Sequence, residues 1–167
     1  MCMNNMNASI FLTTGLKVLE RNVHSLGAIF NGVIPKEDDN GYYLPEFSIM
    51  LNISVMFDLD EDSKTIIEEG FDFKLNKKYE LMIRLSHVDS GLGVSLDKFD
   101  LEISSDKLKT WSKGFYEFRR FIKVPHLTIP KGLGNYTIKL LIREKDDNNE
   151  GIWKTQAISS LVVGDKG

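Results

Sequence analysis

The sequence predicts an all-β protein, folded as an antiparallel β-sandwich of the immunoglobulin-like or another Greek-key kind, with about eight or nine strands and little helix. Apolar side chains alternate with polar ones along several runs, and clusters of turn-forming residues separate those runs. No segment keeps an uninterrupted apolar stripe at helical spacing. We expect one domain over residues 1–167, with flexible ends at 1–7 and 164–167.

The N-terminal region is predicted as two strands, roughly Ser9–Val18 and Leu26–Ile34. A short helix is the alternative for residues 14–26, because apolar residues recur there at helical spacing. Glycines on both sides would interrupt any long helix. We therefore favour two strands that each cross the sheet.

Three strands follow from strict alternation of apolar and polar residues. In the clearest one, Phe47–Phe57, every second residue is apolar, so an extended chain presents one apolar face. Segments 79–87 and 135–143 repeat this pattern. We expect the apolar faces of all three strands to form the core, while Asn52 and its polar neighbours face outward.

Two further strands are predicted with irregularities. Over residues 94–103 the apolar phase slips by one residue, which a β-bulge near Asp97 and Lys98 would absorb. Residues 115–124 show a similar slip around Arg119 and Arg120. Turn-forming clusters divide the strands, as hairpin and Greek-key connections require. These clusters lie at 35–41, 58–63, 75–78, 88–93, 130–135 and 144–151.

The acidic stretch Asp58–Glu69 has carboxylates at positions 1, 3, 5 and 12 of a calcium-binding EF-hand loop. Ser63 stands where that loop needs glycine for its sharp turn. The stretch also follows a predicted strand, whereas an EF-hand loop joins two helices. We interpret it as a soluble turn and predict no metal there.

Calcium held between acidic loops is the other metal chemistry to consider. The chain has three such runs, Glu37–Asp39, Asp58–Asp62 and Asp146–Glu150. If every strand crosses the sandwich once, successive connections alternate between its ends, which places the first and third runs together and the second apart. The three runs then cannot share one ion, and we predict neither a metal nor another cofactor.

The sequence predicts no enzyme. His24, His87 and His126 have no ligand spacing with a cysteine or with one another. The run HVDSG at 87–91 places His, Asp and Ser together, but neighbours in a hairpin point to different faces, so we interpret it as a turn. Cys2 has no activating environment and is interpreted as an idle thiol.

Composition argues against nucleic-acid and membrane partners. The formal charge of −3 and the pI near 5.6 give no broad positive field. A basic and aromatic strip at 115–123 could stack bases, but it also fits a strand with one buried face. No apolar run is long enough to cross a bilayer, and the start resembles no secretory signal. With the single cysteine Cys2, these features predict a cytoplasmic protein.

Four segments carry a resemblance to a family: FLTTGLKV, LGAIFNGVIP, LPEFSIMLNISV and FIKVPHLTIPKGLGNYTIKLLI. Their order resembles an uncharacterised bacterial β-sandwich family whose last such strand opens with P-x-G-x-Y. That motif is stretched here to Pro130, Gly132, Gly134 and Tyr136. The resemblance implies a compact sandwich and no known activity. Abundant Lys, Asn and Ile further suggest an AT-rich bacterial or phage genome.

The predicted function is a non-enzymatic cytosolic binding or assembly module, encoded by a bacterial mobile element or phage, that recognises a protein partner through loops or an edge strand. Association between identical copies is compatible with this prediction. The alternative is a carbohydrate- or ligand-binding β-sandwich that uses exposed aromatic side chains and calcium.

Partner-binding residues are predicted from aromatic side chains in the connections. With alternating connections, segments 35–46, 105–114 and 144–152 should gather at one end of the sandwich. Large aromatic residues there would supply binding energy, because they bury much area while freezing few torsions. An inward tryptophan that plugs the core is the alternative. The candidates are Tyr42, Tyr43, Trp111 and Trp153.

Overall fold

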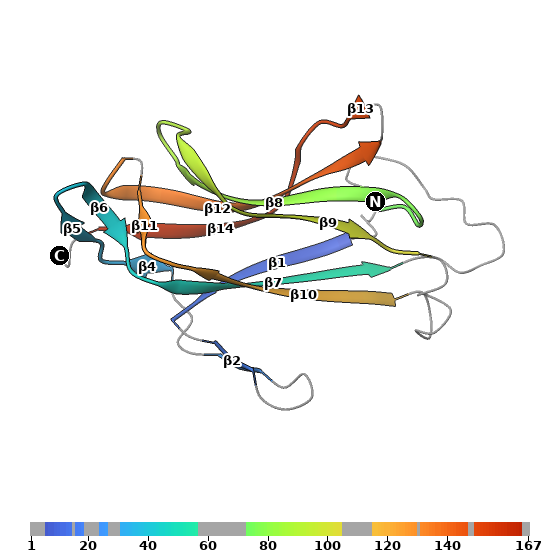
Figure 1. The fold of residues 1–167 in the computed structure, drawn as a ribbon, viewed down its shortest axis with the longest axis horizontal. Coiled ribbons are helices and arrows are strands. Elements are labelled where there is room, and N and C mark those ends of the chain that lie inside the picture. The colour runs from blue at the N-terminus through green and yellow to red at the C-terminus, as the bar shows by residue number, and fades with distance from the viewer. Residues whose placement is uncertain are drawn as a thin grey trace.

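The computed structural model describes residues 6–14, 16–18, 24–26, 31–56, 73–104, 115–129, 131–146 and 149–164 (Figure 1). Within these residues every regular element is a strand and none is a helix, which confirms the all-β prediction. In chain order the strands are β1 (Met6–Thr13), β2 (Leu16–Val18), β3 (His24–Leu26), β4 (Gly32–Val33), β5 (Lys36–Asp38), β6 (Gly41–Leu44), β7 (Phe47–Met56), β8 (Lys78–His87), β9 (Gly93–Glu102), β10 (Phe115–Val124), β11 (Leu127–Thr128), β12 (Gly134–Asp146), β13 (Asn149–Glu150) and β14 (Lys154–Val163).

Two main sheets face each other (Figure 1). The smaller has the order β1-β7-β10 and the larger the order β4-β14-β12-β8-β9, with β13 attached to β12. All of these pairs are antiparallel except β4 with β14. Two small sheets, β11-β6-β5 and β2-β3, complete the described part. The described strands outnumber the eight or nine expected, because strands of two to four residues are too short to show an alternating pattern in the sequence.

The core lies between the two main sheets and is built from the alternating residues. Ile53 and Leu51 of β7, Ile83 of β8 and Leu140 of β12 are fully buried, as their alternation predicts. Burying one such side chain contributes about 1.5–3 kcal/mol. Three central strands therefore supply much of the free energy that holds the sheets together. The fully buried members from β7, β8 and β12 are Ile49, Leu51, Ile53, Val55, Leu81, Ile83, Leu85, Ile138, Leu140 and Ile142.

One of the two predicted irregularities is present. The β8–β9 register jumps between Ile83 opposite Asp97 and Arg84 opposite Ser95, so Leu96 is the extra residue of a bulge. This lies next to the predicted position, and the prediction is confirmed.

The irregularity predicted around Arg119 and Arg120 is wrong, because β10 pairs with β7 without a break. Arg120 keeps the phase of buried Ile122 and Val124. Its Nε donates a hydrogen bond to Asp97 Oδ2 at 2.6 Å, and its guanidinium lies 4.3 Å from the ring centre of Phe99. A paired arginine therefore occupies a position that the sequence pattern assigns to an apolar residue.

The N-terminal prediction needs correction. One long strand, β1, crosses the smaller sheet, and it begins at Met6, inside the segment expected as a flexible end. The second predicted crossing strand, Leu26–Ile34, is replaced in the described residues by the short β3 and β4. Only a strand that spans the sheet carries the chain to its other end. The described N-terminal region therefore contributes one crossing strand, β1, instead of the two expected.

A buried tyrosine fixes the turn that leads into β12. The Oη atom of Tyr136 donates a hydrogen bond to the carbonyl oxygen of Gly132 at 2.8 Å and accepts one from Lys131 N at 3.3 Å. Gly132 has φ +71°, and a Cβ there would come within 3.0 Å of the Tyr42 ring. Burial raises the pKa of Tyr136, against the effect of the Lys131 hydrogen bond. Gly132 and Tyr136 of the sequence motif thus form one hydrogen-bonded corner.

The facing assignment of β7 can be tested with neighbouring substitutions. Ile53→Asp should lower the free energy of unfolding by more than about 4 kcal/mol, because it places an unpaired charge in the core. Asn52→Asp should cost about 1 kcal/mol or less, since Arg119 lies directly opposite on β10. Urea denaturation measures both values. Equal losses would contradict the assignment.

Tyr136→Phe tests the corner. The substitution leaves the ring in place but removes both hydrogen bonds, so the free energy of unfolding should fall by about 1–2 kcal/mol. Tyr43→Phe is the control, because the Tyr43 hydroxyl makes no hydrogen bond within the described residues, and it should change stability by less than about 0.5 kcal/mol. Similar losses for the two variants would show that the corner contributes nothing specific.

Candidate binding surface

The outer face of the larger sheet carries the side chains that β8, β9, β12 and β14 direct away from the core. Because side chains alternate along a strand, the register decides which of them meet across neighbouring strands. Arg143 and Arg84 thus lie directly opposite Glu80 and Lys139, respectively. The first pair joins opposite charges and the second joins two positive charges, so we describe the face in two parts.

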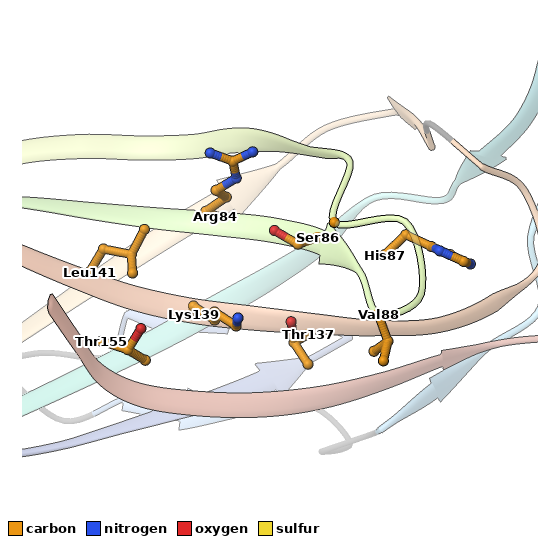
Figure 2. A pocket seen from close by; sticks show the side chains of 9 residues that line it. Arg84, Ser86, His87, Val88, Thr137, Lys139, Leu141 and Thr155 are labelled. Atoms are coloured by element: carbon orange, nitrogen blue, oxygen red, sulfur yellow. The ribbon is translucent and has the colours of Figure 1, made fainter. Parts of the chain in front are cut away.

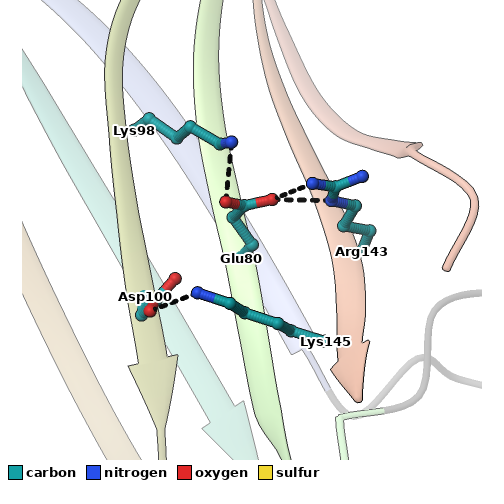
Figure 3. Close-up of polar contacts among 5 residues, drawn as sticks. All are labelled: Glu80, Lys98, Asp100, Arg143 and Lys145. Carbon is teal, nitrogen blue, oxygen red and sulfur yellow. Dashed lines mark hydrogen bonds and ion pairs between the residues drawn. The ribbon is translucent and has the colours of Figure 1, made fainter. Parts of the chain in front are cut away.

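The first part is a charge network, which we define as Glu80, Lys98, Asp100, Arg143 and Lys145 (Figure 3). Glu80 is only 7% exposed, and its Oε2 accepts a hydrogen bond from Arg143 Nε at 2.6 Å and forms an ion pair with Nη2 at 2.5 Å. Its Oε1 lies 2.7 Å from Lys98 Nζ. Lys145 Nζ donates to Asp100 Oδ2 at 2.8 Å. Every charge in the network thus has a partner of opposite sign.

Opposing effects set the acidity of Glu80. Burial is the largest effect and by itself would raise the pKa of this carboxyl group. Hydrogen bonds from Lys98 and Arg143, with their positive charges, together outweigh burial and hold the pKa below its ordinary value of 4.5. Glu80 is therefore a carboxylate at neutral pH and fixes both cations in place.

Trp153 lies on this network. The guanidinium carbon of Arg143 is 4.5 Å from the Trp153 ring centre, and Lys98 Nζ is 6.0 Å from it, so two cations contact the ring. Trp153 does not belong to the core cluster and does not plug it. The preceding residue, Ile152, is 85% exposed. The network thus holds a large aromatic ring beside a protruding aliphatic side chain.

The second part is a cationic depression on β8, β12 and β14 (Figure 2). Its cations are Arg84 and Lys139, which lie directly opposite each other. Neither forms an ion pair with another described residue. The depression is lined by Arg84, Ser86, His87, Val88, Gly91, Thr137, Lys139, Leu141 and Thr155.

The predicted aromatic residues do not gather at one end. Tyr42 and Tyr43 belong to β6, which pairs with β11 close before β12 begins, whereas Trp153 contacts Arg143 near the far end of β12 (Figure 1). Trp111 lies outside the described residues. Segments 35–46 and 144–152 thus occupy opposite ends, because the long strands that run between them, β7, β8, β9, β10 and β12, are odd in number.

The same correction applies to the acidic runs. Glu37–Asp39 lies at the β5–β6 turn and Asp146–Glu150 at the opposite end, so the first and third runs do not meet (Figure 1). The stretch Asp58–Glu69 lies outside the described residues. Within the described ranges no group of three or more His, Cys, Asp or Glu side chains could hold a metal ion.

Tyr42 and Tyr43 have structural contacts of their own. Tyr42 packs against the core and against Gly132, and its carbonyl oxygen accepts a hydrogen bond from Ile129 N at 3.1 Å. The Tyr43 ring stacks on His126, with ring centres 3.7 Å apart. His126 Nε2 in turn lies 3.8 Å from Asp38 Oδ2. One face of the Tyr43 ring is therefore already occupied.

The HVDSG run forms a hairpin turn, as interpreted from the sequence. His87 N donates to Leu92 O at 2.8 Å, and Gly91, with φ +68°, donates to His87 O at 2.9 Å. The inference that its side chains point apart is wrong for one pair, because Ser90 Oγ lies 3.2 Å from His87 Nδ1. Ser90 N also donates to Nδ1, at 3.3 Å. Chain reversal brings the two residues together, and their contact closes the turn.

Comparison with known proteins finds no protein-family model that matches this sequence and no curated protein that matches it. Among the described residues there is no helix with the length and apolar character to span a membrane.

Glu80→Gln tests the charge network. At pH 7 the variant should lose roughly 1.5–3 kcal/mol of unfolding free energy, the range for hydrogen bonds to charged groups. Because the pKa of Glu80 is lowered in the folded state, its contribution is complete above the unfolded value near 4.5 and is lost as pH falls through the folded value. The gap between wild type and variant should therefore shrink on acidification below about pH 4.5.

Denaturant titrations across that pH range supply the measurement. Glu102→Gln is the matched control, since Glu102 is an exposed glutamate on neighbouring β9. It should change stability by less than about 0.5 kcal/mol at any pH in the series. A gap for Glu80→Gln that stays constant down to low pH would contradict the role assigned to its carboxylate.

Proposed function

We propose that this protein is a non-enzymatic binding or assembly module with an immunoglobulin-like β-sandwich, and that a protein partner docks on the outer face of its larger sheet. The proposal combines the strand order, the tyrosine corner and the exposed side chains beside the charge network. No reaction is part of it.

Strand order supports the immunoglobulin-like topology. Among strands of eight residues or more, the first, second and fifth form the smaller sheet, and the seventh, sixth, third and fourth form the larger. Immunoglobulin-like domains pair strands A, B and E in one sheet and G, F and C in the other, with C′ beside C in the variable type. The same order follows here with β1, β7 and β10 facing β14, β12, β8 and β9.

The corner at Tyr136 supports the same topology. Immunoglobulin-like domains carry a tyrosine near the start of strand F whose hydroxyl bonds to the backbone a few residues upstream, two positions before a cysteine. Tyr136 lies near the start of β12, the equivalent strand, and bonds to Gly132. Ile138, fully buried, stands where those domains have the cysteine. Apolar packing thus replaces the disulfide, which suits a reducing compartment such as the cytoplasm.

Because one fold serves many functions, the binding role rests on a specific surface. The observation that carries it is Ile152, 85% exposed and adjacent to Trp153, whose ring is held by Arg143 and Lys98. A protruding aliphatic residue beside an immobilised tryptophan loses little conformational freedom on binding. Such residues supply most of the energy in protein interfaces. We also propose that a bacterial mobile element or phage encodes this chain.

Carbohydrate binding has less support. Sugar recognition would draw on free aromatic ring faces, yet Arg143 covers one face of Trp153 and His126 covers one face of Tyr43. We therefore favour a protein partner. Since the chain has a net charge of −3, nucleic acid stays outside the proposal.

A photo-crosslinking amino acid at position 152 tests this function in cells that express the protein. We expect crosslinks to a small set of proteins, identified by mass spectrometry. Position 34 is the control, because Ile34 is 45% exposed but lies at the other end of the sandwich. It should not give the same crosslinks.

Matched substitutions complete the test. Ile152→Asp should reduce recovery of the crosslinked partner at least tenfold by adding a charge at an apolar contact, whereas Ile34→Asp should leave it unchanged. Both side chains are exposed, so both variants should keep the wild-type melting temperature. Identical crosslinks from the two positions, or unchanged recovery with Ile152→Asp, would refute the proposed surface.

A further inference from the structure

Two cations face each other on neighbouring strands without a counter-charge. Arg84 of β8 and Lys139 of β12 are directly opposite in the register, and both side chains line the cationic depression (Figure 2). Directly opposite residues in an antiparallel pair have Cβ atoms roughly 4.5–5.5 Å apart, and like charges at that separation are destabilising. The pair therefore favours an anion between its members.

The neighbouring side chains provide no such anion. Across the four strands, Lys139 and Arg84 are flanked by Ile158 and Ser95. The outward rows on either side also contain no carboxylate. These rows are Thr155, Leu141, Met82 and Lys98 on one side, and Ser160, Thr137, Ser86 and Gly93 on the other.

The nearest carboxylate along β8 is already engaged. Glu80 lies four residues from Arg84, which at strand spacing is about 13 Å along the chain. Both of its oxygens bind Arg143 and Lys98. The same two strands thus hold one neutralised pair, Glu80 with Arg143, and one pair of like charges. An anion that completes the second pair must come from outside the described residues.

The surroundings of the two cations indicate what carries that anion. Hydroxyl groups of Ser86, Thr137 and Thr155 line the depression and can donate hydrogen bonds to oxygen atoms. Apolar side chains lie beside it, with Ile158 directly opposite Lys139 and 60% exposed. Val88, in the depression, is 54% exposed. The site therefore combines charge, hydroxyl groups and apolar surface on an open sheet face.

We propose that this depression binds an acidic peptide segment of a protein partner, with a glutamate or aspartate carboxylate seated between Arg84 and Lys139. Guanidinium groups bind carboxylates in bidentate geometry, and the lysine supplies the second charge. Adjacent apolar residues of the segment then cover Ile158 and Val88. A free inorganic anion would leave these apolar side chains exposed. This inference rests on the proposed function, because it gives the chemistry of one contact with the same partner.

The test uses a synthetic peptide, acetyl-LELELE-amide, titrated into the full chain by isothermal calorimetry at low salt. We expect saturable binding that is lost with the neutral peptide acetyl-LQLQLQ-amide. Arg84→Gln and Lys139→Gln should each weaken it at least tenfold. Lys123→Gln should bind as wild type does, since Lys123 lies on β10 of the other sheet. Equal weakening by all three variants would show only non-specific attraction and overturn the site.

Competing ligands decide the class of occupant. Inorganic phosphate at the same concentration should displace the peptide poorly, and complete displacement would assign the site to a small anion instead. Wild-type protein should sediment as a monomer at the concentrations used. Self-association that Lys139→Glu abolishes would assign the site to a second copy of this chain and overturn the peptide proposal.

Lys139→Glu also tests the argument from charge without any ligand. The substitution places opposite charges on the two facing positions, so the melting temperature should rise while peptide binding disappears. A lower melting temperature would contradict the repulsion on which the inference depends. If Ile152→Asp abolishes partner recovery while Arg84→Gln and Lys139→Gln leave it intact, this inference fails and the proposed function stands.

Discussion

The register of β8 against β12 is the constraint on which the rest of the structure depends. A shift by one residue would turn every side chain on one strand to the opposite face and remove its apolar residues from the core. Each strand has a buried tyrosine near its start whose hydroxyl binds the preceding backbone: Tyr136 bonds to Gly132 and Lys131, and Tyr79 accepts a hydrogen bond from Lys74 N at 2.9 Å. The antiparallel strands are therefore fixed at both ends. That pairing places Glu80 against Arg143 and, four residues further on, one cation against another.

Much of the fold could be predicted because the buried apolar residues of a strand recur at every second position of the sequence. The inward residues of β7, β8 and β12 were all recognisable in this way, and so was the bulge on β9. The pattern fails where a polar side chain binds a partner on the other main sheet. Arg120 holds an inward position through Asp97, so its strand looked irregular although its pairing is continuous. It fails also for strands of two or three residues, such as β4, which are too short to show a period.

The candidate surface was harder to predict than the fold. Trp153 was recognised as an aromatic residue in a connection, but its contacts with Arg143 and Lys98 depend on strand order. Alternation alone shows that Arg84 and Lys139 point outward, and it does not show that they meet. A sequence gives the face of each residue, whereas the partner across the strands follows from the register. The separation of Tyr43 from Trp153 also depends on the path of the chain, since the long strands between them, β7, β8, β9, β10 and β12, are odd in number and place the two residues at opposite ends.

The bulge at Leu96 hinders strand pairing between two copies of the chain at the edge of the larger sheet. In the described part of the larger sheet β9 is an edge strand, and a straight edge with open backbone groups invites a strand from another chain, which leads to aggregation. The extra residue twists this edge, and Lys98, Asp100 and Glu102 add charge along it. Edge-to-edge pairing at β9 is thereby discouraged. The side chains on the outer face of the sheet stay exposed, while growth of the sheet by addition of a strand at this edge is resisted.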